Sequence, residues 1–294
     1  MKKIIISGAT GFIGKALTKL LTDNGYEVYI LTRDQSKSSQ KGYIHWDIDK
    51  RIVNEEKFKN CFAVIHLAGA GIADARWSNS RKKEIIRSRV DSSNFIYETF
   101  EKINEMPEVY ISASGVGYYG ADTGTTEISE SSELGTDFVA KVCELWEKSS
   151  IQFSNKNVRT VILRTGVVID AQGGYVKKIA DTIFGGVVGL VGSGNQKLSW
   201  IHLKDLCNMY LFAVQNPNIS GIFNAVCNSE ITQKEANIII AKYFKNYWFS
   251  IPTPSFIFKI IFGELSTLLL GQNNINSGKI RNAGFKFEIE KFNL

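Results

Sequence analysis

Short apolar runs alternate with longer segments of helical periodicity along the first 165 residues. The runs are rich in β-branched residues and stand at Lys3–Ser7, Glu27–Leu31, Tyr43–Trp46, Ala63–Leu67, Val109–Ser112 and Arg159–Leu163. Between them, amphipathic periodicity predicts helices over Phe12–Asn24, Glu55–Asn60, Ser80–Ile103 and Asp137–Phe153. Strands that are apolar along their whole length are covered on both faces, as in a parallel sheet. The pattern therefore predicts an α/β protein with a doubly wound parallel sheet of the Rossmann type.

The regular alternation loosens after Thr165. The later segments are a glycine-rich stretch over Gly185–Gly194, an expected helix over Leu203–Gln215, an expected strand over Gly221–Val226, a linker at Pro252–Pro254, a helix over Ser255–Leu270 that we expect to be buried against the body, and a short strand over Gly284–Phe287. We expect a dinucleotide-binding core over residues 1–165, a remaining core strand and smaller substrate lobe over 166–250, and a C-terminal helical appendage over 251–294.

Composition and charge narrow the classes of function. With 294 residues, 44% of them hydrophobic, the chain is long enough to bury a sizeable core. The net charge of +6 comes from scattered basic residues, the densest cluster being Arg81–Lys83. Nucleic-acid binders usually concentrate their charge in one stripe. We therefore expect a small-molecule substrate and no nucleic-acid partner. We also expect a homodimer or monomer.

Cysteine usage and apolar segments indicate the compartment. The four cysteines are widely spaced: Cys61, Cys143, Cys207 and Cys227. This spacing favours reduced thiols and no metal site. The apolar run Ile4–Ile6 is too short for a signal peptide, and Ser255–Leu270 carries two charges and falls short of the roughly 20 residues of a bilayer span. We expect a cytoplasmic protein with no membrane partner.

A glycine-rich turn follows the first predicted strand and opens the first predicted helix. In such a turn Gly8 makes the tight bend, Gly11 lets backbone N–H groups approach a pyrophosphate, and Gly14 lets the helix lie close to the strand. The helix N-terminus adds partial positive charge. The predicted cofactor contacts of this turn are Gly8, Thr10, Gly11, Phe12, Ile13 and Gly14. The alternative is an ordinary strand–turn–helix corner.

The end of the second predicted strand bears on the choice between NAD and NADP. NAD sites place an acid about 20 residues after the glycine turn, where it accepts from the ribose hydroxyl. Here neutral Thr32 and cationic Arg33 stand instead, and a guanidinium suits a 2′-phosphate. A shift of one residue would make Asp34 the ribose acid. As a separate alternative, Arg33 is only a solvated loop charge. We predict NADP(H), with NAD less favoured.

Two further strand ends are candidates for cofactor contact. Asp47 ends the third predicted strand, where its carboxylate either accepts from the adenine amino group or is solvated. Small residues close the fourth strand at Leu67, Ala68 and Gly69. They would let the backbone pass close to a nucleotide, although a tight turn alone also explains them.

These features and several later motifs resemble the extended short-chain dehydrogenase/reductases, and in particular an atypical, sugar-nucleotide-epimerase-like branch with a C-terminal domain of unknown function. The motifs are Thr10–Gly14, His66–Gly69, Arg76-Trp77 before Arg81-Lys82, Ser112–Gly120, Cys143–Glu147, Arg164–Val168, Gly192–His202 and Leu269–Gln272. The resemblance runs nearly end to end. It implies a Rossmann fold, a nicotinamide cofactor and chemistry at a hydroxyl or carbonyl group.

The chain departs from that family's catalytic pattern. The family uses a Ser/Thr and a Tyr-x-x-x-Lys, in which lysine lowers the pKa of the tyrosine and the phenol exchanges a proton with the substrate. Here Asp137 stands four residues before Lys141, in the place of the tyrosine. Counting back from Gly120 places the family's serine on or beside Gly115, so that Ser114 is a near match.

Two tyrosines follow the fifth predicted strand, at the sheet end where such folds bind substrate. Either Tyr118 or Tyr119 could replace the missing phenol, or both rings could pack beneath the loop. The predicted catalytic set is therefore Ser114 with Tyr118 or Tyr119.

Other residues are candidates for holding the substrate. They are Arg76, Trp77, Arg164, Trp200 and His202. An indole beside cations suits a base or a diphosphate, but Arg76 and Trp77 could also begin an exposed helix. Arg164 could contact a phosphate or pair with a buried acid, and His202 could be a structural histidine.

Two hypotheses follow. The first is an NADP-dependent oxidoreductase or epimerase-like enzyme that acts by hydride transfer on a small substrate, with nucleotide-linked compounds among the candidates. The second is an NADP-binding redox sensor or regulatory protein with weak catalysis, which the missing Tyr-x-x-x-Lys favours.

Overall fold

A parallel β-sheet forms the centre of the protein, described here from a computed structural model of residues 1–183, 185–228, 230–244 and 249–294. Within these residues the sheet has eight strands in the order β12-β8-β6-β5-β1-β2-β3-β4. Their bounds are β1 Lys3–Ser7, β2 Glu27–Thr32, β3 Tyr43–Asp47, β4 Ile52–Val53, β5 Cys61–His66, β6 Val109–Gly115, β8 Arg159–Thr165 and β12 Gly221–Ala225. All neighbours pair in parallel except β3 and β4, which are antiparallel. This is the predicted doubly wound α/β architecture.

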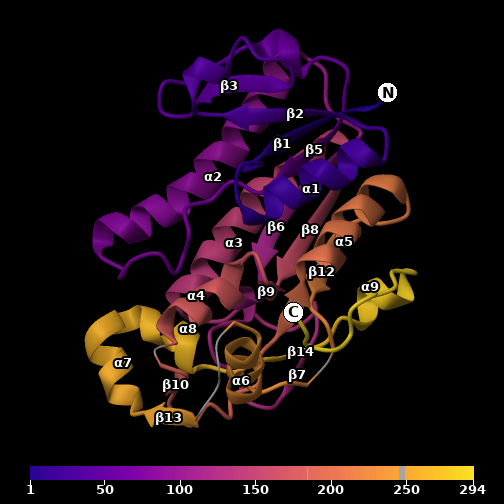
Figure 1. The fold of residues 1–294 in the computed structure, drawn as a ribbon. Coiled ribbons are helices and arrows are strands. Elements are labelled where there is room, and N and C mark those ends of the chain that lie inside the picture. The colour runs from indigo at the N-terminus through magenta and orange to yellow at the C-terminus, as the bar shows by residue number, and fades with distance from the viewer. Residues whose placement is uncertain (184, 229, 245–248) are drawn as a thin grey trace.

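Helices cover both faces of the sheet. Figure 1 shows α1 (Phe12–Asp23) and α5 (Leu203–Gln215) on one side, and α2 (Asn79–Lys102) and α3 (Phe138–Ile151) on the other. Successive residues of one strand point to opposite layers, so Ile4 and Ile6 join the core under α1 and α5, while Ile5 joins the core under α2. Burial on both faces explains why these strands are apolar along their whole length.

A smaller lobe continues from the carboxyl end of the sheet and occupies the lower part of Figure 1. It contains α4 (Gly174–Thr182), α6 (Gln233–Phe244), the parallel pair β9 (Val167–Asp170) and β11 (Trp200–His202), and the parallel pair β10 (Val187–Val191) and β13 (Phe249–Thr253). Its core includes Val176 and Trp200 together with Phe292 from the C-terminus.

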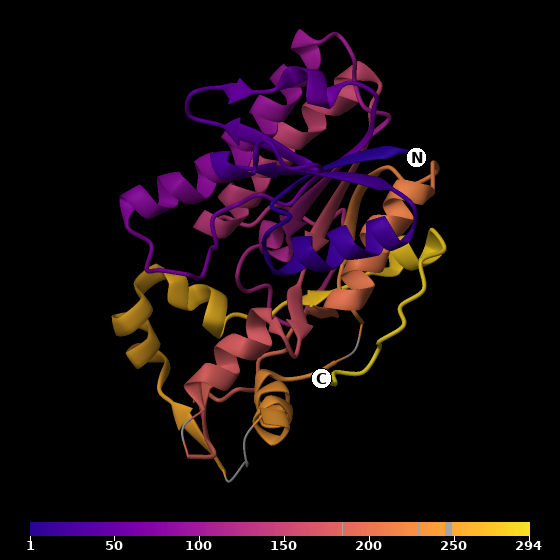
Figure 2. The ribbon, with the colours of Figure 1, turned by 45° about the horizontal axis from the view of Figure 1, so that its top comes forward.

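The C-terminal segment returns to both parts of the protein (Figure 2). It comprises α7 (Ser255–Phe262), a 3₁₀ turn (Gly263–Leu265), α8 (Ser266–Leu270), β14 (Asn274–Ile275) and α9 (Gly278–Asn282). Strand β14 pairs with β7 (Glu127–Ile128), and Ile280, Phe285 and Phe287 pack into the core beside α1 and α5. The C-terminal residues therefore contribute to the cores of both the main body and the smaller lobe.

The structure confirms the six early strands and the helices at α1, α2, α3 and α5, with ends that differ by up to three residues. Other 3₁₀ turns span Gln35–Lys37, Val116–Tyr119 and Gln152–Lys156, and the predicted helix over Glu55–Asn60 is a 3₁₀ turn at Glu55–Phe58. The linker predicted at Pro252–Pro254 is wrong, because Phe249–Thr253 forms β13. No strand forms over Gly284–Phe287.

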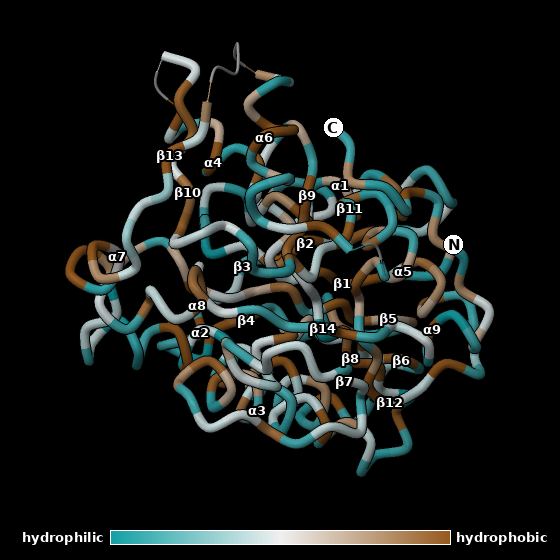
Figure 3. Tube along the Cα trace, turned by 90° about the horizontal axis from the view of Figure 1, so that it is seen from below, coloured by the Kyte–Doolittle hydropathy of each residue, from teal (hydrophilic) through white to brown (hydrophobic). Residues whose placement is uncertain are grey.

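The prediction of one buried helix over Ser255–Leu270 is wrong in two respects. The helical segment is interrupted at Gly263, whose φ of +57° is left-handed. It is also not buried along its first part, because Phe256, Ile260 and Ile261 are all more than half exposed. Figure 3 shows α7, brown over much of its length, at the periphery of the protein. No helix within the described residues has the length and apolar character needed to cross a bilayer.

Candidate functional site

The glycine turn between β1 and α1 is built as a backbone-lined corner. Gly8 has a φ of +73°, and a Cβ atom there would lie 2.8 Å from the Leu67 carbonyl carbon. A Cβ on Gly14 would overlap the Gly8 carbonyl oxygen and the Ala9 backbone. Both glycines are therefore required for the helix, the turn and the loop after β5 to lie this close together.

The N-terminus of α1 is left open to a ligand. Its N-cap is Gly11, no side chain caps the helix, and no acidic residue stands in its first turn. The Gly11 amide donates to the Gly8 carbonyl oxygen at 3.1 Å, which closes the turn. Thr10 is exposed beside it. The uncapped amides of the Phe12–Ile13–Gly14 turn and the helix dipole together suit an anion such as a pyrophosphate.

The two charged residues directly after β2 differ in their contacts within the described residues: Arg33 has no partner, whereas Asp34 is hydrogen-bonded to Ser36. Arg33 is exposed and makes no hydrogen bond or ion pair within the described part of the chain. Asp34 instead caps its own turn, because its carboxylate accepts from the Ser36 hydroxyl at 2.6 Å and amide at 3.0 Å. These hydrogen bonds lower the pKa of Asp34. Thr32 is buried and accepts from the Asp34 amide at 3.1 Å.

Asp47, the predicted adenine contact, has a local role at the end of β3. Its carboxylate accepts from the Lys50 amide at 3.0 Å and lies 3.5 Å from the Lys50 ammonium group. The backbone hydrogen bond is the main reason that the pKa of Asp47 is lowered. These contacts give the Asp47 carboxylate a structural role in the turn after β3.

The loop after β5 is held by side chains from beneath. The Ala68 amide donates to the Ser7 hydroxyl at 3.3 Å, and that hydroxyl is also hydrogen-bonded to His66 Nδ1 at 2.6 Å. Burial lowers the pKa of His66 to about 4, so the imidazole is neutral at physiological pH. The loop at Leu67 and Ala68 lies directly against Gly8.

Gly69 has a specific neighbour, Arg89, that was not among the predicted site residues. A Cβ atom on Gly69 would lie 2.9 Å from Cζ of Arg89, a buried residue of α2. Arg89 Nη1 donates to the Ala70 carbonyl oxygen at 3.0 Å. The available signal was periodicity, because Arg89 lies on the same helix face as buried Ile85 and Ile96.

The positions of the family's tyrosine and lysine serve structure here. Asp137 is the N-cap of α3: its carboxylate accepts from the Ala140 amide at 2.9 Å and from the Ala121 amide at 2.7 Å. Lys141 points to Glu144, with a 2.8 Å ion pair, and is more than half exposed. Neither side chain is arranged to exchange a proton with a substrate.

A buried polar cluster lies behind the loop after β6. Glu147 accepts from Arg164 Nε and Nη2 at 2.8 Å each, and from the Ser114 hydroxyl at 2.7 Å. Burial alone would lower the pKa of Arg164, but Glu147 outweighs it and the pKa is raised. The alternative that Arg164 pairs with a buried acid is thus what the structure shows. Ser114 has its proton directed to that acid.

The two tyrosines have different surroundings. The Tyr119 hydroxyl donates to Asn224 Oδ1 at 2.7 Å, and burial is the main cause that raises the pKa of Tyr119. Tyr118 lies with its ring centroid 3.3 Å from the guanidinium carbon of Arg164. The Tyr118 hydroxyl has no hydrogen-bond partner within the described residues, and its oxygen retains some solvent-accessible surface. Only the Tyr118 hydroxyl of this pair is available to a ligand.

The remaining substrate candidates are dispersed. Trp77 is buried, with Nε1 donating to the Ile72 carbonyl oxygen at 2.8 Å, whereas Arg76 is exposed beside Gly263. Trp200 is completely buried in the core of the smaller lobe, so it cannot reach a substrate in this conformation. His202 caps α5, with Nδ1 accepting from the Lys204 amide at 3.1 Å.

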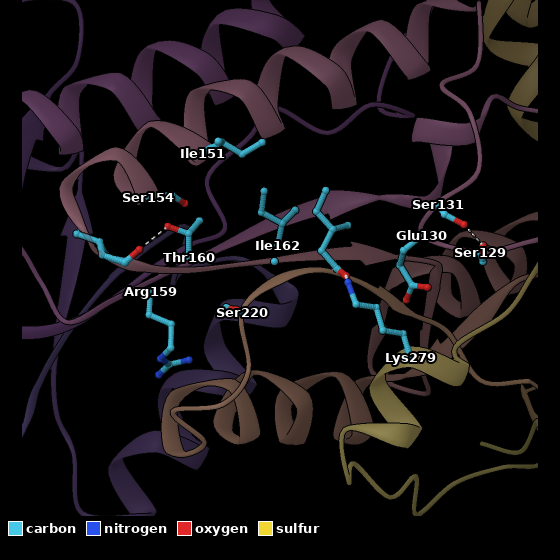
Figure 4. A pocket seen from close by; sticks show the side chains of 13 residues that line it. Ser129, Glu130, Ser131, Ile151, Ser154, Arg159, Thr160, Ile162, Ser220 and Lys279 are labelled. Atoms are coloured by element: carbon cyan, nitrogen blue, oxygen red, sulfur yellow. Dashed lines mark hydrogen bonds between the residues drawn. The ribbon is translucent and has the colours of Figure 1, made fainter.

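A cavity of about 770 Å³ lies elsewhere, at the β12 edge of the sheet. Figure 4 shows Ile162 near its centre, Ile151 above, and Glu130 and Lys279 toward one end. Lys279 donates to the Ile222 carbonyl oxygen at 2.7 Å, and Glu130 accepts from the Asn224 amide at 2.8 Å. None of the predicted site residues lines this cavity.

Comparisons with known proteins connect these features to one family. The model of the NAD dependent epimerase/dehydratase family matches residues 4–225. The "Epimerase family protein YfhF" of Bacillus subtilis is 32% identical over 97% of this chain and 93% of its own length. The "Epimerase family protein SDR39U1 homolog, chloroplastic" of Arabidopsis thaliana is 33% identical over 97% of this chain and 83% of its own length.

A solved structure agrees with these sequence matches. The crystal structure of human epimerase family protein SDR39U1 (isoform 2) with NADPH superposes with a TM-score of 0.83 at 25% identity, and covers 98% of this chain and 96% of that one. The similarity therefore extends over both the sheet and the smaller lobe.

Proposed function

The chain belongs to the NAD dependent epimerase/dehydratase family, and on that premise we propose that it is an NADP-dependent oxidoreductase or epimerase-like enzyme. It binds NADP(H) across the carboxyl end of the sheet and acts on a hydroxyl or carbonyl group of a small substrate. The bound nicotinamide would supply or accept the hydride. The carrying observation is the uncapped N-terminus of α1 at Gly11, behind a turn that only glycine at positions 8 and 14 permits.

The selectivity for NADP follows from the residues after β2. Arg33 is exposed and unpaired within the described chain, while the neighbouring acid Asp34 is committed to Ser36. A guanidinium with unused donors pairs well with a 2′-phosphate. The human relative whose structure contains NADPH supports the same choice.

Tyr118 is the residue best suited to move a proton. Its hydroxyl is unpartnered within the described residues, whereas those of Ser114 and Tyr119 are committed to Glu147 and Asn224. In the reducing direction the Tyr118 hydroxyl would give its proton to the substrate oxygen, while its ring stays packed against Arg164. Ser114 and Arg164 would act by positioning the loop that carries Tyr118.

A second candidate function rests on Asp137. Its role as a helix cap leaves the chain without the Tyr-x-x-x-Lys pair, which favours a cofactor-binding sensor with weak catalysis. The two functions share the cofactor site and differ only in turnover.

One experiment separates them. Purified protein is titrated with NADPH by ligand fluorescence and is then assayed for NADPH oxidation with a panel of aldehydes and ketones. The enzyme proposal expects tight NADPH binding in both wild type and Tyr118→Phe, with turnover lost only in the variant. Binding without turnover on any substrate supports the sensor, and failure to bind either nicotinamide cofactor refutes both.

A further inference from the structure

Arg89 of α2 is a buried cation that has no counter-ion among the described residues. It is 9% exposed, and it forms no ion pair with any described residue. Arg164, the other deeply buried arginine near the site, is neutralised by Glu147 through two 2.8 Å contacts. A desolvated charge is costly unless it is paired, so the unpaired Arg89 requires an explanation.

One edge of the Arg89 guanidinium is fixed and the other is open. Nη1 donates to the carbonyl oxygens of Ala70 at 3.0 Å and Ile85 at 2.9 Å, and the group lies 4.8 Å from the ring centroid of Trp146. Nε and Nη2 make no hydrogen bond with described residues. Both nitrogen atoms nevertheless retain some solvent-accessible surface, so a ligand can reach them. The protein thus orients two unused donors in a largely dry environment.

The charge persists at neutral pH. Burial is the main cause that lowers the pKa of Arg89, to about 10, and Arg81 lowers it further. Since this value lies well above 7, the guanidinium remains protonated. An oxyanion that reaches Nε and Nη2 would form a charge-assisted pair there and relieve the desolvation cost.

The position of Arg89 corresponds to the nicotinamide half of the proposed cofactor site. Its neighbour Gly69 follows β5. Its neighbour Trp146 lies one turn from Cys143, whose sulfur would be 3.7 Å from a Cβ on Gly115, the last residue of β6. In the sheet order β6-β5-β1-β2, the turn after β1 serves the pyrophosphate and the end of β2 the adenosine ribose. The nicotinamide end then extends toward β5 and β6, where Arg89 lies.

We propose that Arg89 is an oxyanion-binding residue of this site, which pairs through Nε and Nη2 with a phosphate or carboxylate. The oxyanion belongs either to the diphosphate of the cofactor or to the substrate. In the second case the substrate is an anionic hydroxy or keto compound. This inference rests on the proposed function for its location, but the binding of an oxyanion to Arg89 can be tested alone.

The test compares Arg89→Gln with a matched control, Arg87→Gln. Arg87 lies on the same helix but is 65% exposed and pairs with Asp49 and Asp91. NADPH affinity is measured by ligand fluorescence, and protection from thermal unfolding by inorganic phosphate and by acetate is measured with and without NADPH. If the oxyanion belongs to the cofactor, Arg89→Gln weakens NADPH by at least about tenfold, as expected for a lost charged hydrogen-bonded pair, and Arg87→Gln does not.

If the oxyanion belongs to the substrate, NADPH affinity is unchanged in Arg89→Gln, but protection by phosphate or acetate is lost, and Arg87→Gln keeps it. A folded Arg89→Gln protein with wild-type NADPH affinity and wild-type anion protection overturns the proposal. If the wild-type protein binds no nicotinamide cofactor, the proposed function fails. Protection from thermal unfolding by phosphate or acetate, measured without NADPH, still tests whether Arg89 binds an oxyanion.

Arg89→Lys provides the second variant, because it keeps the charge but loses the planar fork. If Arg89→Gln does not fold, a weakened NADPH or anion response in folded Arg89→Lys supports the proposal, and wild-type values for both refute it.

Discussion

The Asp137 carboxylate accepts a hydrogen bond from the Ala121 amide at 2.7 Å, and so ties the start of α3 to the loop that follows Tyr118 and Tyr119. The same carboxylate caps α3 through the Ala140 amide at 2.9 Å. The position at which the Tyr-x-x-x-Lys pattern would place its tyrosine is thus used here to fix the loop that follows Tyr118 and Tyr119.

Asp137→Ala is expected to lower the free energy of unfolding by about 1–2 kcal/mol, because it removes a helix cap and a loop hydrogen bond. Chemical denaturation measures this. Lys141→Ala is the control: the Lys141–Glu144 pair is exposed at the lysine, and its loss should cost under about 0.5 kcal/mol. If Asp137 instead served catalysis alone, the two variants would be equally stable.

Arg33→Ala is expected to weaken NADPH binding by about tenfold or more and to leave NADH binding nearly unchanged, because only NADPH carries the 2′-phosphate. Fluorescence titration of the two cofactors measures the ratio. Lys37→Ala removes a nearby cation that is engaged with Asp34 at 4.0 Å, and it serves as the matched control. Equal weakening of both cofactors by Arg33→Ala would reject Arg33 as the selector.

Glu147→Gln is expected to destabilise the protein by about 3–5 kcal/mol, because it leaves the Arg164 guanidinium buried without its counter-charge. The double variant Glu147→Leu with Arg164→Met removes both charges and should recover much of this loss. Urea unfolding of the two proteins measures the difference. A double variant no more stable than Glu147→Gln would mean that packing, and not the unpaired charge, dominates the loss.

The parts of the fold that depend on local rules could be predicted from the sequence. Strands buried on both faces appear in the sequence as continuous apolar runs. The bend at Gly8 needs a residue with left-handed backbone angles, which the presence of a glycine indicates. Pro252 misled the prediction. It lies in β13 at the edge of a two-stranded pair, where a strand tolerates a residue without an N–H donor.

Features made by residues distant in the sequence were harder to find. The partner of Arg164 is Glu147 on another element, and the loop that Arg89 holds lies about 20 residues before it. The hydroxyls of Tyr118 and Tyr119 could be told apart only after Asn224 was placed against one of them. Composition and motif spacing carry no information about such contacts.

His66 makes stability depend on pH. Burial lowers its pKa from 6.5 to about 4, so at intermediate pH the unfolded chain binds a proton that the folded protein does not. The stabilisation linked to His66 is therefore fully present above about pH 6.5 and is lost progressively as the pH falls toward 4. Linkage gives a loss of about 2 kcal/mol between pH 7 and pH 5 from this residue.

Urea unfolding of wild type and His66→Asn at pH 7 and pH 5 tests this dependence. The variant keeps a polar group near Ser7 but cannot take up the proton, so its unfolding free energy should change by about 2 kcal/mol less than that of wild type. His45→Asn, which removes a partly exposed histidine from β3, should retain the wild-type dependence. An equal loss in wild type and His66→Asn would show that other groups cause the acid sensitivity.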